Sequence, residues 1–496
     1  MELFGFDILQ LFTLSNLLAV VLGTLVGLII GAIPGLGIML AMVMLLPLTF
    51  YMEPLASILL LLAVYQAAEY GGSISSITLG VPGTPAAVAT LLDGHPMAKQ
   101  ESPGKALAYS LTASTIGGFF GAAVLIFLSA PLSAFALTLA DTEFALLGVL
   151  GLMGVVSLST KDIVKSLISM VLGLLAGTIG IDLITGEMRF TLGSLELMEG
   201  VELVALVVGL FAFSEVFSII SEDLHTRYNA SDSKKLRGGL SYSEFKHIMK
   251  PTAIGSSIGS VVGMLPGLGG DASAWFSYSL AKKNSKRPET FGKGNPEGIA
   301  APEAANNATV GGALLPLLTL GIPGSPATAL VLGAFIIHGI QPGPQVFANN
   351  KDLIYGIFFG FVLTTVAMYF AGRLLTPMFA RVLTVPNSFL APAILLMSMI
   401  GVYATSQSFF DLWVAIVIGC VFFLLKKLDY SLPTFLLAFI LSPVIEKGLR
   451  RALFISNGDY SIFVTRPTSL VILLIILAII LIPFFRWILS RNRIDN

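Results

Sequence analysis

The sequence predicts an all-α polytopic membrane protein with about 11–12 membrane spans, built from two inverted structural repeats that contain Gly/Pro-broken helices or re-entrant hairpins. Composition is the first observation: 55% of the 496 residues are hydrophobic and only 11% are charged, with a mean hydropathy of +0.89. A soluble domain carries about 25% charged residues. The second observation is that apolar runs of about 17–25 residues recur along nearly the whole chain. The third is a pair of Gly/Pro-rich phrases that each occur once in each half.

The repeated phrases are long and keep their order. Residues 23–37 read GTLVGLIIGAIPGLG, and residues 255–269 read GSSIGSVVGMLPGLG. Residues 78–86 read TLGVPGTPA and residues 319–327 read TLGIPGSPA, which are identical at seven of nine positions. Broken hydrophobic segments at corresponding places in two halves are typical of secondary transporters.

Several classes of function are disfavoured by what the sequence lacks. The single Cys420 excludes a disulfide framework and a thiolate metal site. A net charge of −1 gives no reason to expect nucleic acid as a partner. The sequence has no HExxH, GxSxG, Walker A or dinucleotide motif, so it predicts a protein that is not an enzyme and needs no cofactor. The first residues include Glu2 and Asp7 but no basic residue, so we expect the first apolar segment to be retained.

The chain is predicted to have four parts. These are a first membrane repeat, a cytoplasmic linker, a second membrane repeat, and a C-terminal loop with an extra helix: residues 1–221, 222–250, 251–446 and 447–496. Beyond the two phrases, spans are expected near 106–137, 142–159, 163–183, 199–221, 353–377, 389–407, 412–425, 431–446 and 468–488.

The positions of basic loops predict that the two long phrases enter the membrane from opposite sides. Segments 222–250 and 282–293 are rich in Lys and Arg and flank the apolar segment 251–281. If both flanks are cytoplasmic, that segment enters the membrane and returns, with PGLG at its tip. The first copy, about 13–50, has no basic residue on either flank, so it is expected to enter from the other side.

A further pair of loops agrees with this topology, and one region disagrees. Lys99 and Lys105 follow the first TLGVPGTPA phrase, whereas the loop after the second phrase has only Lys351. Basic residues near the C-terminus would face outward under the same scheme: Lys447, Arg450, Arg451 and Arg466.

The four Gly/Pro breaks predict a binding site at membrane depth. The breaks at Pro34-Gly35 and Pro266-Gly267 leave N–H groups without partners at the start of the next half-helix, where partial positive charge favours anions. Thr84 and Ser325, each followed by Pro, are predicted helix N-caps. Four such helix starts could meet at one midplane cavity, although ordinary Pro/Gly kinks are the alternative for any single break. The predicted substrate-binding residues are Pro34, Gly35, Gly37, Ser73, Gly83, Thr84, Pro266, Gly267, Gly269, Asn306, Asn307, Gly324 and Ser325.

Polar residues inside apolar segments are functional candidates. Asn306 and Asn307 are predicted to line the substrate cavity, because an unsatisfied amide in an apolar environment costs on the order of a few kcal/mol. Glu69 and Glu303 are either functional or close to the membrane interface. Asp271 follows the second PGLG and is either a site for a coupling Na⁺ or H⁺ or a helix cap. His95 and His338 are expected in loops or at the interface.

The glycines before each break have a different predicted role. Gly23, Gly27 and Gly31 lie one turn apart on one helix face, as do their counterparts in the second copy. This small-xxx-small spacing is typical of closely packed membrane helices.

At 294–344 the chain reads GNPEGIAAPEAANNATVGGALLPLLTLGIPGSPATALVLGAFIIHGIQPGP. This run resembles the large membrane subunit of the tripartite tricarboxylate transporter family, the TctA-like proteins. Residues 31–37 and 69–99 are similar to the first-half signature of that family. One detail departs from it, since Thr84-Pro85 stands where many members have Glu followed by a small residue.

The resemblance implies a multi-pass protein of the bacterial inner membrane that imports citrate or other carboxylates, driven by a Na⁺ or H⁺ gradient. It also implies two partners, a small four-helix TctB-like membrane subunit and a periplasmic TctC-like solute-binding protein, and leaves open a homodimer of the complex. A stand-alone ion-coupled organic anion transporter is the alternative, and a membrane-embedded enzyme or scaffold is a third interpretation. As mechanism we expect a block carrying both broken-helix pairs to move against the remaining helices, with substrate held by backbone amides near Gly35, Gly83, Gly267 and Gly324.

Overall fold

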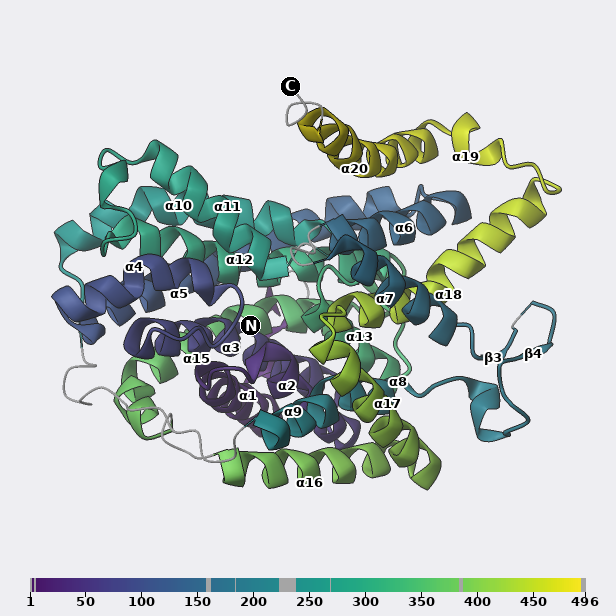
Figure 1. The fold of residues 1–496 in the computed structure, drawn as a ribbon, viewed down its shortest axis with the longest axis horizontal. Coiled ribbons are helices and arrows are strands. Elements are labelled where there is room, and N and C mark those ends of the chain that lie inside the picture. Colours follow the sequence, from purple (N-terminus) through teal and green to yellow (C-terminus); the bar gives the residue numbers. More distant parts are fainter. Residues whose placement is uncertain are drawn as a thin grey trace.

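The computed structural model describes a helical protein with two very short strand pairs (Figure 1). The residues it describes are 2–3, 6–157, 162–182, 184–222, 238–267, 269–382 and 387–491. Four basic residues of the predicted linker lie outside these ranges: Arg227, Lys234, Lys235 and Arg237. The predicted division into four parts stays a prediction.

The first half begins with a two-stranded pair and continues as helices. Its elements are β1 (Glu2–Leu3), β2 (Phe6–Asp7), η1 (Ile8–Phe12), α1 (Leu14–Ala32), α2 (Gly37–Leu45), η2 (Leu46–Tyr51), α3 (Pro54–Leu79), α4 (Ala87–Gln100), α5 (Pro103–Ala136), α6 (Asp141–Ser157), α7 (Ile163–Ala176), β3 (Gly180–Ile181), β4 (Met188–Arg189), η3 (Glu196–Glu199), α8 (Leu203–Val207), the π-helical η4 (Val208–Phe213) and α9 (Ser214–Glu222). The second half contains α10 (Tyr242–Met264), α11 (Gly269–Asn284), η6 (Pro288–Thr290), α12 (Pro296–Leu320), α13 (Pro326–Ile337), α14 (Val346–Asn349), α15 (Lys351–Val382), α16 (Asn387–Ser406), α17 (Phe409–Lys427), α18 (Leu432–Ile455), α19 (Ile462–Thr465) and α20 (Pro467–Arg491).

The helices confirm the predicted all-α membrane class. Among the described residues, 8 helices are long and apolar enough to cross a membrane. Shorter apolar helices accompany them at Gly37–Tyr51, Ile163–Ala176, Pro326–Ile337 and Pro467–Leu481. The count of about 11–12 spans therefore stays a prediction.

Helices α3 and α12 form the buried centre of the bundle. Each packs against one glycine-rich helix, α1 against α3 and α10 against α12. The most apolar window of α3 is 94% buried. A Cβ on Gly27 of α1 would lie 2.5 Å from the Val64 carbonyl oxygen of α3, and one on Gly259 of α10 would lie 2.1 Å from the Ala305 carbonyl oxygen of α12. The glycines thus allow two helix backbones to approach closely, as their spacing predicted.

The two long phrases form the same local structure. In the first, α1 ends at Ile33 (φ −81°, ψ 117°), and Gly35 and Gly37 have φ values of 91° and 69°. In the second, α10 ends at Leu265 (φ −86°, ψ 113°), and Gly267 and Gly269 have φ values of 89° and 66°. Glycine is needed at these positions because other residues rarely adopt such φ values.

Each broken helix pair turns back toward its starting end. Lys250 Nζ of α10 donates to the Asn284 carbonyl at the end of α11, 3.2 Å away, so the two ends of this pair lie side by side. In the first pair, α1 runs parallel to α3, because Gly23 faces Leu60 and Gly31 faces Ala68. Ser57 Oγ near the start of α3 donates to the Thr49 carbonyl after α2 at 3.0 Å, so the chain leaving α2 returns to the level of the start of α1.

Helices α3 and α12 run in opposite directions. Ser57, at the start of α3, hydrogen-bonds His338 at the end of α13, 2.8 Å away. Asp93 of α4 accepts backbone N–H bonds from the residues before α12, Gly292, Lys293, Gly294 and Asn295. The beginning of each central helix therefore lies beside the short helix that follows the other.

Ion pairs account for two of the basic residues that disagreed with the topology prediction, Arg450 and Arg466. Arg450 pairs with Asp182 at 2.6 Å and with Glu446 at 3.1 Å, and Arg189 pairs with Glu446 at 2.6 Å. Arg466 contacts Glu143 at 2.8 Å. Paired arginines near the projecting β3–β4 hairpin (Figure 1) carry much less net positive charge than their number suggests.

We expect the Asp182–Arg450 pair to make stability depend on acid. The hydrogen bond from Arg450 lowers the pKa of Asp182 below its usual 3.8, helped by the N–H groups of Ile184 and Thr185. A depressed folded-state pKa gives stability that is present above the unfolded value and lost as the pH falls through the folded value. The thermal midpoint of the wild type should therefore fall more steeply below about pH 4 than that of Arg450→Gln. Parallel curves would contradict this role of the pair.

Candidate functional site

Both copies of both phrases meet at one cavity of about 480 Å³. The described residues that line it are Gly35, Leu36, Gly37, Ile38, Met39, Tyr65, Glu69, Pro82, Gly83, Thr84, Pro85, Phe211, Gly269, Gly270, Asp271, Ser325, Pro326, Ala327 and Pro433. The first turns of α2 and α11 thus border the same space, which makes the cavity our candidate functional site.

Some backbone amides predicted to bind substrate are already used. The Gly267 N–H donates to the Gly324 carbonyl at 2.9 Å, and the Gly83 N–H donates to the Gly72 carbonyl at 3.2 Å. These bonds fix the turns to each other and to α3, so neither amide is available to an anion. Substrate binding by backbone amides near Gly83 and Gly267 would therefore use neighbouring N–H groups, and it stays a prediction.

The two predicted N-caps differ. Ser325 caps α13 as expected: its Oγ accepts from the Thr328 N–H at 3.2 Å, and Thr328 Oγ1 accepts from the Ser325 N–H at 2.8 Å. Helix α4 begins only at Ala87, and its N-cap position has no side-chain bond. The Thr84 prediction is wrong because its side chain faces Gly72 of α3, where a Cβ would lie 2.4 Å from Thr84 Oγ1.

The cavity is acidic. Glu69 and Asp271 both line it, and none of its described lining residues is basic. Tyr65 OH lies 3.2 Å from Ser325 Oγ, which joins α3 to the start of α13. An organic anion could be held here only together with a cation or protons that offset the carboxylates, because burying like charges together is strongly unfavourable.

The structure does not place the two predicted asparagines on the cavity surface. Asn306 lies directly behind it: a Cβ on Gly270 would be 2.4 Å from Asn306 Oδ1 and 3.3 Å from Glu69 Oε1. Asn307 points elsewhere and donates to Gln66 Oε1 at 2.7 Å. Because Gln66 on α3 accepts hydrogen bonds from the Asn307 amide, that amide no longer needs the substrate as a partner.

The remaining predicted residues divide into two groups. Those on the cavity are Gly35, Gly37, Gly83, Thr84, Gly269, Ser325 and the ion candidate Asp271. Those not among its lining residues are Pro34, Ser73, Pro266, Gly267, Asn306, Asn307 and Gly324. Ser73 instead donates to Glu303.

Besides some residues in or next to the repeated phrases, the prediction lacked three lining residues from elsewhere in the chain, Tyr65, Phe211 and Pro433. Tyr65 could have been found, because it and Asn306 both lie thirteen positions before the threonine of a TLG phrase. Phe211 and Pro433 come from segments without a repeated motif, so no comparable signal pointed to them.

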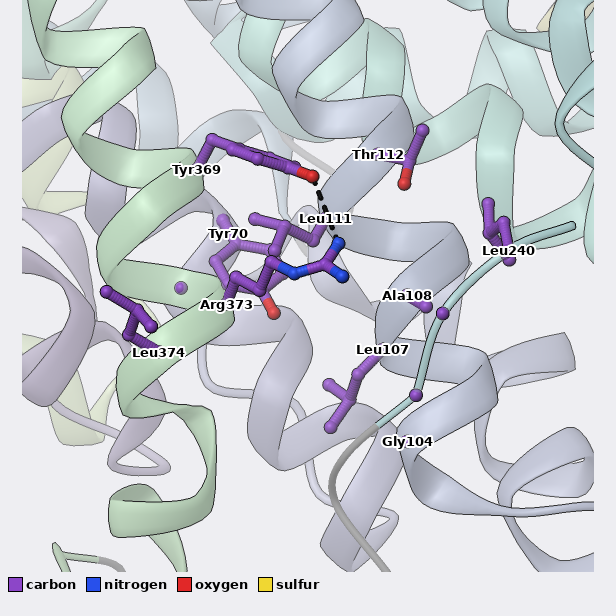
Figure 2. A pocket seen from close by; sticks show the side chains of 13 residues that line it. Tyr70, Gly104, Leu107, Ala108, Leu111, Thr112, Leu240, Tyr369, Arg373 and Leu374 are labelled. Atoms are coloured by element: carbon purple, nitrogen blue, oxygen red, sulfur yellow. Dashed lines mark hydrogen bonds between the residues drawn. The ribbon is translucent and has the colours of Figure 1, made fainter. Parts of the chain in front are cut away.

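A second cavity of about 320 Å³ lies between α5, α15 and the segment before α10. Figure 2 shows Arg373 and Tyr369 projecting into it from one helix, with Thr112 on the facing helix, and Arg373 Nη1 donating to Tyr369 OH at 3.1 Å. It contains none of the repeated Gly/Pro residues, so we do not place the site there.

Comparison with known proteins gives consistent matches. The model of the tripartite tricarboxylate transporter TctA family matches residues 17–437. An uncharacterized 52.8 kDa protein in the TAR-I ttuC' 3' region of Agrobacterium vitis is 38% identical over 459 residues, which are 92% of this chain and 91% of that protein. An uncharacterized protein in the TAR-II ttuC' 3' region of the same organism is 39% identical over 231 residues, 46% of this chain and 96% of the relative. No solved structure matches the chain.

Proposed function

Since this chain belongs to the tripartite tricarboxylate transporter TctA family, we propose that it is the large membrane subunit of a secondary transporter that imports tricarboxylates or related carboxylates. The observation that carries the proposal is that residues from both copies of both Gly/Pro phrases line one cavity. Broken helices around a buried cavity are how secondary transporters place polar backbone at membrane depth. A transport role also agrees with the absence of the enzyme motifs from the sequence.

The contacts between halves support an inverted repeat. Gln66 and Asn307 each lie twelve positions before the threonine of a TLG phrase, and they hydrogen-bond each other. Two equivalent residues in contact are expected near a twofold axis. The opposite directions of α3 and α12, set by the contacts of Ser57 and Asp93, support an axis in the membrane plane.

We expect cysteine labelling to report opposite entry of the two broken pairs. Tyr51 follows the first pair and Ser285 follows the second. In a Cys420→Ser background, Tyr51→Cys should react with an impermeant maleimide from the periplasm, and Ser285→Cys only after the cytoplasmic face is opened. Reaction of both from one side would contradict the inverted repeat.

The acidic cavity supports import coupled to a cation. Glu69 and Asp271 would repel a carboxylate on their own, so a Na⁺ or H⁺ bound with the substrate would lower the cost of moving it. We propose that the two broken-helix pairs move together against the other helices to expose the cavity to each side in turn. Distance measurements between labels on α2 and α17 in inward- and outward-facing states would test this movement, and constant distances would favour local gating.

The proposed partners are a small four-helix TctB-like subunit and a periplasmic TctC-like binding protein in the bacterial inner membrane. Reconstitution separates this proposal from the stand-alone alternative. Full-length protein in liposomes should take up labelled citrate under an ion gradient only when both partners are added. Uptake without them would support a self-sufficient organic anion transporter, and no uptake of any carboxylate by the full set would contradict the proposed substrate class.

A further inference from the structure

A single carboxylate of α12 is surrounded by hydroxyl groups from three other helices. Glu303 is 1% exposed. Its Oε1 accepts from Ser73 of α3 and from Thr90 of α4, the latter at 2.5 Å. Its Oε2 accepts from Ser110 and Ser114 of α5, both at 2.8 Å. The five side chains bring at least six oxygen atoms together in the interior of the bundle.

The side chains of this cluster are held in a defined arrangement, because every member is buried and each carboxylate oxygen has two hydroxyl partners. Ser73, Ser110 and Ser114 are 0% exposed and Thr90 is 1% exposed. Among the described residues, no Lys, Arg or His forms an ion pair or hydrogen bond with Glu303. A buried carboxylate with no basic partner requires a proton or a cation to offset its charge.

The hydroxyl groups suit a metal cation. A proton would use one acceptor, whereas this group offers six oxygen atoms, two from the carboxylate and four from hydroxyls. Each hydroxyl oxygen also keeps lone pairs that can bind a hard cation, for which oxygen is the preferred ligand. One carboxylate balances one monovalent charge, while a divalent cation usually recruits several carboxylates.

We infer that Glu303, Ser73, Thr90, Ser110 and Ser114 form a Na⁺ site separate from the candidate cavity. Glu303 and Asn306 lie one turn apart on α12, and Asn306 lies directly behind Gly270 of the cavity, where a Cβ would be 2.4 Å from Asn306 Oδ1. A bound ion would also tie α4, which follows the first Thr-Pro turn, to α5 and α12. Its assignment as a coupling site rests on the proposed transport function, whereas ion binding itself does not.

Thermal unfolding of the purified full-length chain tests binding without transport. Replacing K⁺ by Na⁺ at constant ionic strength should raise the unfolding midpoint, because a ligand that binds only the folded state stabilises it. Glu303→Gln should remove the response to Na⁺. Thr90→Val and Ser114→Ala, which keep the charge and nearly the shape, should raise the Na⁺ concentration for half of the maximal shift by about tenfold. Ser129→Ala, which removes a buried hydroxyl elsewhere on α5 that bonds to the Leu125 carbonyl, should leave this shift in place.

The outcomes are distinguishable. If the cluster only stabilises the fold, Thr90→Val and Ser114→Ala will lower the midpoint equally in Na⁺ and K⁺, which overturns the inference. It is also overturned if Asp271→Asn abolishes the Na⁺ response while Glu303→Gln retains it, or if the wild type responds to acid but not to Na⁺. A Na⁺ response lost in Glu303→Gln supports the site even if reconstituted protein transports no carboxylate, which would be a failure of the proposed function alone.

Discussion

Asp271→Asn is expected to reduce concentrative uptake strongly while leaving the protein folded. Asp271 lines the cavity in the first turn of α11, where the helix N-terminus favours a negative charge. The substitution preserves the shape but removes one of the two carboxylates that could hold a cation beside the substrate. Asp271 is exposed to the cavity, and loss of one charged ligand there costs about 1.5–3 kcal/mol. Uptake should therefore fall by about 10- to 100-fold.

A matched control is provided by the repeat. Met39 occupies the corresponding position after the first PGLG and lines the same cavity. Met39→Leu conserves volume and charge, so it should retain most of the uptake. Initial rates of labelled citrate uptake in liposomes, normalised to inserted protein, provide the comparison. Uptake by Asp271→Asn within about threefold of Met39→Leu would exclude Asp271 from coupling.

Gly259→Leu is expected to prevent stable folding. Even a Cβ at this position would lie 2.1 Å from the Ala305 carbonyl oxygen and 2.8 Å from its Cα, so α10 and α12 would have to separate. A backbone clash cannot be relieved by a side-chain rotamer, and we expect a cost above the usual 1–3 kcal/mol of overpacking, about 4 kcal/mol or more. Gly27→Leu should behave similarly, because its Cβ would lie 2.5 Å from the Val64 carbonyl oxygen.

Recovery from the membrane measures this effect. Gly239 is a suitable control, since a Cβ there meets nothing within 4 Å and its backbone is not in the positive-φ region. Gly239→Leu should elute as a single species in size-exclusion chromatography, whereas Gly259→Leu should be aggregated or degraded. Equal recovery and equal thermal midpoints would show that the close contact of α10 with α12 is not needed for folding.

Local features of the site were predictable because they depend on residues within one or two turns. Hydrophobic length determined most helices, and Pro-Gly pairs determined where α1 and α10 end. The Ser325 cap followed from a hydroxyl directly before Pro. The same pattern gave a wrong prediction of a cap at Thr84, because the Thr84 side chain packs against Gly72 on another helix instead.

The sequence by itself determined the membrane class, the family resemblance and the repeated breaks of this protein. Only the tertiary structure decided which polar groups meet. It joined Asn307 to Gln66, used the Gly267 N–H to bind the Gly324 carbonyl, and brought four hydroxyl groups to Glu303. The physical reason is that a helix break depends on nearby backbone atoms, whereas the partner of a buried polar side chain depends on how distant segments pack together, such as Glu143 and Ser469, 326 residues apart.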